Sequence, residues 1–450
     1  MPALLLAVTL AGLLAPLPAR AGGETLFPDV GTQRLQVRTY DVRLDYAPST
    51  NRVEADVVVR ARTGKRLKTF ALDFEGPTVT EVLVDGEEAT HSREGSSLRV
   101  RPRPPVQPGR FVVRVSYEGR PPEHTDPDGS TEGWVRTSDG AVALGQPVGA
   151  MTWLPSNNTP GDKARFVFRV TVPGTHQVAA NGELVGTATS TRGTTWTWRQ
   201  DEPMSTYLAM VAIGRFDVTE QTMRSIDGRR LPLWSFEDTE VGEADDAIAL
   251  TPQVISWLER KVGPYPFSSA GLVSDDAYVG YALETQTRPF YPPGAASPAL
   301  VVHEVAHQWF GNSVTLTDWH DIWLNEGFAT YAEWMWSGRS GGLTPRQHFD
   351  RLYSRAPSSD LWSPAPTEFT DPADLFGEPV YLRGAMTLQA LRERIGSKDF
   401  FRLLRRWHAK HEHGSAETRD LVRLAEKVSG RDLGRLFRDW LRTDGRPSGY

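Results

Sequence analysis

The sequence predicts an α+β protein of two domains, in which an amino-terminal antiparallel β saddle or sandwich precedes a mainly helical domain. The chain has 450 residues, enough for two to four domains of about 100 to 200 residues each. From about residue 33 to residue 218, apolar and polar residues alternate, which is typical of half-buried strands. After about residue 219, apolar residues recur at three- and four-residue spacing, which is typical of helices.

The first 21 residues have the pattern of a signal peptide. Residues 3–15 form a mostly apolar run, which is shorter than the roughly 20 residues that a membrane-spanning helix needs. Ala19-Arg20-Ala21 then supplies the small-x-small pattern that signal peptidase accepts. We therefore expect cleavage after Ala21 and a mature protein that is secreted to the extracellular space.

Residues 22–218 are assigned to the amino-terminal β domain. Alternation is clear in residues 53–60, where Val53, Ala55, Val57 and Val59 face one side. Further strands are predicted within residues 70–74, 79–84, 111–117, 166–172 and 194–198. The segment 119–140, rich in Pro, Asp and Gly, is predicted to be a long surface loop.

Residues 219–450 are assigned to the second domain. Helices are predicted over residues 243–261, 298–310, 322–336, 379–394, 398–410, 416–428 and 433–441. Ser297 followed by Pro298 is a typical helix start, and Gly396 and Gly430 stand just past two helix ends. Three histidines near position 410 are interpreted as a solvated helix end rather than as a metal site.

Charge and cysteine content exclude several classes of function. Fifty Lys and Arg against 56 Asp and Glu give a net charge of −6, which offers no reason to bind nucleic acid or to associate stably with a membrane surface. The chain has no cysteine, so disulfides, thiolate metal sites and cysteine nucleophiles are excluded. Any metal site must use histidines and carboxylates.

The most specific motif is His303-Glu304-x-x-His307, inside a predicted helix. Residues four apart lie on one face of a helix, so both imidazoles can bind one zinc ion. A catalytic zinc needs a third protein ligand, and our candidate is Glu326, which lies early in the next predicted helix. We expect one zinc ion per chain. The ion would lower the pKa of a bound water towards about 7, and Glu304 would act as the general base.

This pattern, with Glu326 inside Asn325-Glu326-Gly327, resembles the gluzincin zinc aminopeptidases related to aminopeptidase N. The segment 263–267, Gly-Pro-Tyr-Pro-Phe, is also similar to a family segment. The resemblance implies a saddle-shaped β domain, a thermolysin-like catalytic domain and removal of amino-terminal residues from peptide substrates. Larger members add a carboxy-terminal helical domain, and this chain is expected to be a short form without it.

The resemblance also implies a second catalytic residue. Tyr381-Leu382-Arg383-Gly384 is similar to the family's Y-x-K-G segment, with Arg383 in place of the usual lysine. In the family, this tyrosine stabilises the oxyanion that forms when the peptide carbonyl is attacked. We therefore expect Tyr381 to be catalytic.

Substrate-binding residues are implied in the same way. The segment 281–285, Tyr-Ala-Leu-Glu-Thr, stands where the family commonly has G-A-M-E-N on an edge strand, so Ala282 and Glu284 are expected to bind substrate. Glu284 would accept the free ammonium of the peptide. Gln146 aligns with a position of the β domain that helps to bind the same amine.

Three functions remain open from the sequence. A secreted zinc aminopeptidase fits the whole set of residues. A thermolysin-like zinc endopeptidase would use the same ligands and base, and only Glu284 and Gln146 separate the two. A catalytically silent, peptide-binding relative that keeps the fold is the third alternative.

Overall fold

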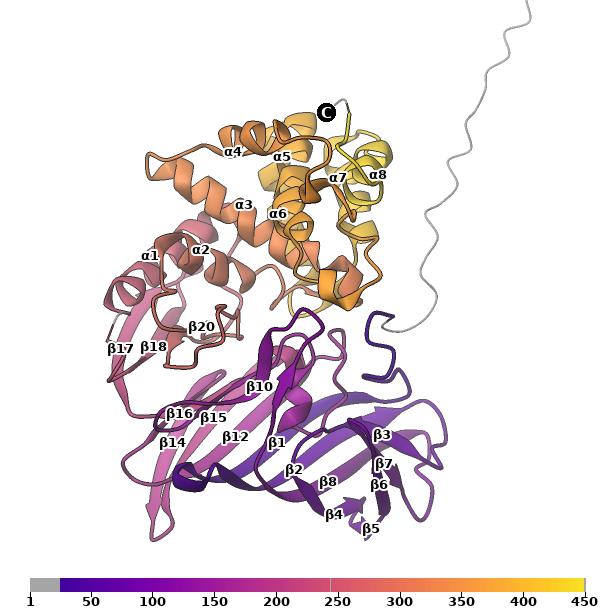
Figure 1. The fold of residues 1–450 in the computed structure, drawn as a ribbon, viewed down its shortest axis with the longest axis vertical. Helices are drawn as coiled ribbons and strands as arrows, with labels where there is room; N and C mark the ends of the chain where they lie inside the picture. Colours follow the sequence, from indigo (N-terminus) through magenta and orange to yellow (C-terminus); the bar gives the residue numbers. More distant parts are fainter. Residues whose placement is uncertain (1–24, 243, 449–450) are drawn as a thin grey trace, which may run out of the picture.

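The computed structural model describes residues 25–242 and 244–448, which form a β domain and a helical domain stacked on each other (Figure 1). The predicted signal peptide and its cleavage site after Ala21 lie outside the described residues. Within those ranges, no helix combines the length and apolar character needed to cross a bilayer.

The β domain is built on an eight-stranded sheet in the order β14-β15-β12-β1-β2-β8-β4-β5. Its strands are β1 (Gln36–Ala47), β2 (Arg52–Thr63), β4 (Thr78–Val84), β5 (Glu87–Glu88), β8 (Gly109–Gly119), β12 (Ala164–Val172), β14 (Glu183–Ser190) and β15 (Gly193–Met204). All neighbours are antiparallel except β1 and β12, which pair in parallel. The predicted alternation is confirmed in β2, where Val53, Ala55, Val57 and Val59 are buried.

Two smaller sheets complete the domain. The five-stranded sheet has the order β13-β16-β11-β10-β9, and the three-stranded sheet has the order β3-β7-β6. Their strands are β3 (Phe70–Asp73), β6 (Thr90–Glu94), β7 (Ser97–Arg101), β9 (Glu123–Thr125), β10 (Thr131–Arg136), β11 (Ala141–Leu144), β13 (Gln177–Ala180) and β16 (Val211–Gly214).

The prediction of a surface loop over residues 119–140 is wrong. Strands β9 and β10 form a hairpin there, and most of β10 is buried. The Pro, Asp and Gly residues occupy the turn 126–130, whose ends are joined by a hydrogen bond from the Asp126 amide to the Ser130 carbonyl. The composition of the turn therefore hid the short strands on either side of it.

The second domain opens with a four-stranded sheet that the helical pattern did not predict. Its order is β17 (Phe216–Arg224), β18 (Arg230–Asp238), β19 (Ala270–Ser274) and β20 (Phe290–Tyr291). The expected domain boundary between residues 218 and 219 falls inside β17. A short parallel pair, β21 (Thr315–Leu316) with β22 (Ser415–Ala416), lies further along the chain.

Eight α-helices follow in the described residues: α1 (Asp245–Val262), α2 (Pro298–His307), α3 (Trp323–Arg339), α4 (Pro345–Tyr353), α5 (Gly384–Ile395), α6 (Ser397–His411), α7 (Thr418–Ser429) and α8 (Gly434–Leu441). Seven of them match predicted helices. Helix α4 was missed, although Thr344 and Gln347 form a reciprocal capping box at its start. Residues Pro379–Arg383, before α5, form a π-helical turn.

The two domains are tied together beside the end of α2. The buried ammonium of Lys163, from the β domain, donates to the carbonyls of Asn312 and Ser313 at 2.8 and 2.9 Å. Those carbonyls belong to the turn that follows α2. The β domain therefore holds the segment through which the chain passes from α2 towards α3.

Candidate active site

Helix α2 carries the histidine pair. Its start is defined by Ser297, whose side chain accepts a hydrogen bond from the Leu300 amide, and by Pro298 in the first turn. His303 and His307 lie one helical turn apart and are both buried, with 6% and 1% of their surface exposed. The spacing predicted from sequence therefore places both imidazoles on one protected face.

Helix α3 brings Glu326 to the two imidazoles. Glu326 Oε2 lies 3.2 Å from His303 Nε2 and 3.4 Å from His307 Nε2. Two ligands bound at about 2.1 Å to a tetrahedral zinc are separated by about 3.4 Å. The two separations from Glu326 match those between zinc ligands, and all three ligand atoms lie within 4.8 Å of one another, which supports the predicted ligand set.

The outer nitrogens of both imidazoles are engaged elsewhere. His303 Nδ1 lies 2.6 Å from Glu333 Oε1, and His307 Nδ1 lies 3.1 Å from the Phe310 carbonyl oxygen. These contacts hold Nε2 of each ring towards Glu326, as expected for metal-binding histidines. The sequence analysis missed Glu333, although a residue seven positions after Glu326 lies on the same face of α3.

The ligand carboxylate stays ionised. Burial would raise the pKa of Glu326, but the adjacent imidazoles, His307 first, hold it at about 2. The carboxylate is the form of Glu326 that binds a metal, but the same contacts raise the pKa of His307 to about 9, so a bound cation would displace protons from the imidazoles.

Glu304 is buried beside the ligands, with 3% of its surface exposed. Burial raises its pKa to about 8, against the lowering effect of the two imidazoles. Its Oε2 atom is buried without a hydrogen-bond partner. A buried carboxylate with a free oxygen can accept a proton from a molecule bound in front of the histidines.

Tyr381 lies in the π-helical turn and its ring stacks beside His303, with ring centroids 6.0 Å apart. Burial, together with Glu326 and its neighbours, raises the pKa of Tyr381 well above its usual value, so the phenol remains a hydrogen-bond donor. The approach of its segment to α3 depends on Gly327 and Gly384. A Cβ on Gly384 would lie 3.0 Å from the Gly327 Cα atom.

Arg383 is the residue that differs from the resembled Y-x-K-G segment, and it is fully buried. Its guanidinium donates to the carbonyls of Trp362, Asp439, Trp440 and Thr443. It therefore joins the turn that carries Tyr381 to the carboxy-terminal helix α8 and the segment after it.

Glu284 and Gln146 meet at the site from different domains. Gln146 Nε2 donates to Glu284 Oε1 at 2.7 Å, and both side chains are buried. Glu284, Glu304 and His307 place ligand atoms within 4.8 Å of one another. Ala282 is half-buried two residues before Glu284.

The expected edge strand around Glu284 is reduced to a single β bridge between Leu283 and Phe290. Leu283 and Phe290 exchange two backbone hydrogen bonds, and side-chain amides hold the rest of this segment. Asn312 donates to the Glu284 carbonyl at 2.6 Å. The backbone of Glu284 is therefore fixed by the turn after α2.

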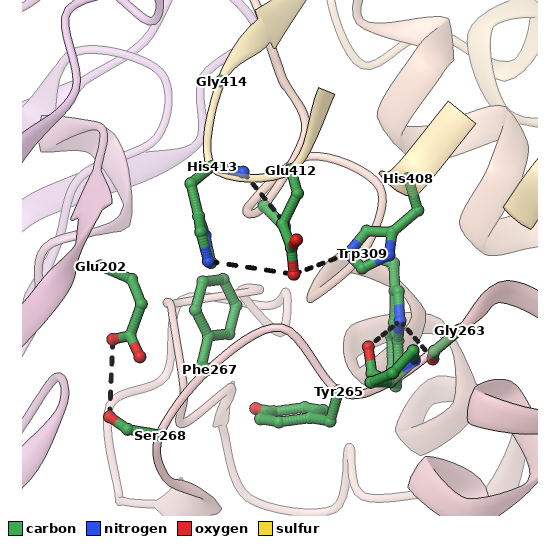
Figure 2. A network of polar contacts seen from close by, with 12 residues as sticks. Glu202, Gly263, Tyr265, Phe267, Ser268, Trp309, His408, Glu412, His413 and Gly414 are labelled. Carbon is green, nitrogen blue, oxygen red and sulfur yellow. Dashed lines mark hydrogen bonds and ion pairs between the residues drawn. The ribbon is translucent and has the colours of Figure 1, made fainter. Parts of the chain in front are cut away.

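Figure 2 shows the polar contacts around Trp309, which follows the end of α2. Trp309 Nε1 donates to the carbonyls of Gly263 and Pro264, each at 3.1 Å. Both belong to the segment 263–267, which resembles a segment of the family. The predicted solvated helix end nearby is only partly solvated, because His408 is buried with 3% exposure. Its Nε2 atom lies 3.9 Å from Glu412.

Residues 295–440 match the peptidase family M1 domain, and residues 38–208 match the peptidase M1 N-terminal domain. The chain belongs to peptidase family M1. The resemblance to the aminopeptidase N-like gluzincins and the predicted two-domain fold are thereby confirmed.

Curated M1 relatives include the aminopeptidase N of Streptomyces lividans, 25% identical over 94% of this chain, and the leucyl aminopeptidase of Saccharolobus solfataricus, 25% identical over 92%. The chain spans about half the length of these relatives, 52% and 54% respectively. Among solved structures, the M1 zinc metallopeptidase of Deinococcus radiodurans, in a mutant form bound to a Tyr-Ser-Ala substrate, is 28% identical with a TM-score of 0.83. The match covers 95% of this chain and 98% of that one.

The M1 neighbour from Deinococcus radiodurans is a zinc metallopeptidase, so zinc is the ion to consider for this donor set. His303, His307 and Glu326 would hold it, because their converging atoms and ionised carboxylate suit a zinc ion.

Proposed function

We propose that this chain is an exported zinc-dependent aminopeptidase that removes amino-terminal residues from peptides. Export is supported by the apolar run at residues 3–15 and the small-x-small pattern ending at Ala21. The activity is supported by the names of its M1 relatives and by the arrangement of the buried side chains.

When bound, zinc would supply a Lewis acid that makes a water molecule nucleophilic at neutral pH. Glu304, on the same helix as both imidazoles, would take the proton from that water and pass it to the departing amine. Tyr381 would donate a hydrogen bond to the developing oxyanion without adding a charge.

The observation that carries the proposal is the contact between Glu284 and Gln146. The buried carboxylate of Glu284, beside the base Glu304 and held by the Gln146 amide of the other domain, can form an ion pair with a primary ammonium. An acetylated amino end has no charge and cannot form this ion pair. An endopeptidase must admit a chain that continues through this position. The geometry therefore favours an aminopeptidase over the thermolysin-like alternative.

The test compares fluorogenic amino-acid substrates having a free amine with their acetylated forms. We expect hydrolysis of the free-amine substrates only, lost with a zinc chelator and restored by zinc. Glu284→Gln should raise KM for free-amine substrates at least tenfold, while the control Glu87→Gln, on the exposed strand β5, should leave KM unchanged.

Two results would contradict the proposal. Equal cleavage of free and acetylated peptides would indicate an endopeptidase. Peptide binding with zinc present but without hydrolysis would indicate a silent relative.

A further inference from the structure

A second cluster of metal-binding side chains lies on the β9–β10 hairpin. His124 and Asp126 are two residues apart and project to the same side, because side chains alternate along an extended chain. Glu132 is the cross-strand partner of His124 in the register of the hairpin. A segment of nine residues therefore places one imidazole and two carboxylates together.

Their ligand atoms lie within 4.8 Å of one another, and His124 Nε2 is 3.9 Å from Asp126 Oδ1. Glu132 is fully buried, and the Asp126 side chain is 4% exposed. Both oxygens of Asp126 and Oε2 of Glu132 are buried without a hydrogen-bond donor beside them, although the Asp126 and Glu132 carboxyl groups contact each other. Each of the three residues thus offers one ligand atom close to those of the other two, and a buried acceptor without a donor is costly.

The imidazole of His124 is oriented in the same way as that of a ligand in the first site. Its Nδ1 atom lies 2.9 Å from Glu75 Oε2, which leaves Nε2 directed at Asp126. His303 is held between Glu333 and Glu326 in the same manner. An outer carboxylate on a histidine is the usual support of a metal ligand.

We propose that His124, Asp126 and Glu132 form a second binding site for a divalent transition-metal ion, zinc in the first place, with Glu75 positioning the imidazole. A mixed set of one nitrogen and two carboxylate donors suits zinc better than calcium, which prefers oxygen donors alone. Ligands of a tetrahedral zinc are separated by about 3.4 Å, so the observed 3.9 Å needs a shift of only about half an ångström.

The site would anchor the hairpin against both segments that carry the proposed amine-binding residues. Glu132 Oε1 accepts a hydrogen bond from the Val148 amide, two residues after Gln146. Tyr281, three residues before Glu284, donates its hydroxyl to the Thr131 carbonyl at 2.7 Å. The metal would thus be structural, bound at the edge of the catalytic centre rather than in it.

The test counts zinc ions in the full chain. Protein stripped with a chelator is titrated with zinc in a competition assay, and the bound metal is measured by elemental analysis. We expect two ions for the wild type, one for Asp126→Asn and two for the control His91→Ala, on the exposed strand β6. Glu75→Gln should weaken only the second ion, by about 10- to 100-fold.

A competing arrangement is a proton shared between the two carboxylates, next to a protonated His124. In that case, the wild type would bind a single ion and Asp126→Asn would bind the same number, which would overturn the proposal. Filling of the second site by calcium in preference to zinc would also overturn it.

The double variant His303→Ala/His307→Ala should retain one ion, which separates this site from the first. If that variant does not fold, the comparison of the wild type with Asp126→Asn still shows whether a second zinc ion binds at Asp126. A failure of the proposed peptidase activity would leave the count of zinc ions unchanged.

Discussion

Replacing Arg383 by lysine, the residue usual in the resembled Y-x-K-G segment, should destabilise the catalytic domain. The guanidinium is fully buried and donates to four backbone carbonyls, with distances of 2.8 Å to Trp440 and 2.6 Å to Trp362. A lysine ammonium has three donors on one atom and cannot reach carbonyls on separate segments. Two of the four acceptors would then be left buried without a partner.

Each buried acceptor without a donor costs about 1 to 2 kcal/mol. Two of them give a loss of about 2 to 4 kcal/mol in the free energy of unfolding for Arg383→Lys. The variant should be measured by urea denaturation, followed through tryptophan fluorescence, because Trp362 and Trp440 both contact the guanidinium through their carbonyls.

The matched control is Arg423→Lys, at an exposed position of α7, which should change the free energy by less than about 0.5 kcal/mol. If Arg383→Lys unfolds at the same urea concentration as the wild type, the four carbonyl contacts do not stabilise the domain and the reasoning fails.

Three further predictions concern catalysis, zinc affinity and pH. Tyr381→Phe should lower kcat by about 10²- to 10³-fold with zinc content unchanged, and a normal kcat would exclude its role. Glu333→Gln should weaken zinc binding by about 10- to 100-fold, measured by chelator competition; an unchanged affinity would contradict its support of the ligand histidine. Burial, and then the nearby His413, lower the pKa of His408 to about 4, while Glu412 lies 3.9 Å away. Because the folded state then binds fewer protons than the unfolded chain, stability is complete above about pH 6.5 and falls towards pH 4 by up to about 3 kcal/mol. His408→Gln should reduce the difference between the melting temperatures at pH 7 and pH 5. An unchanged difference would contradict the role of His408 in the pH dependence of stability.

Much of the fold could be predicted because it follows from local spacing. Alternation of apolar residues identified β2, and three- and four-residue spacing identified seven of the eight helices in the described residues. The pair His303 and His307 needed only one helix to bring it together. Short strands were missed where the local pattern was weak, as in the β9–β10 hairpin, because strands of three and six residues carry too little periodicity.

The sequence alone also identified Glu326, from the need for a third ligand and its place early in the next predicted helix, and Tyr381, through the family resemblance. It did not identify the outer carboxylates Glu333 and Glu75: the place of Glu333 on the same helix face as Glu326 was overlooked, and Glu75 lies far from His124 in the sequence.

By itself, then, the sequence determined which helix presents the metal-binding imidazoles, because residues four apart share a face whatever surrounds them. Only the tertiary structure decided that Gln146 of one domain meets Glu284 of the other, and that Arg383 holds the Tyr381 turn to the end of the chain. Such contacts join residues 138 positions apart in the first case, and they depend on how whole sheets and helices pack, which no local pattern specifies.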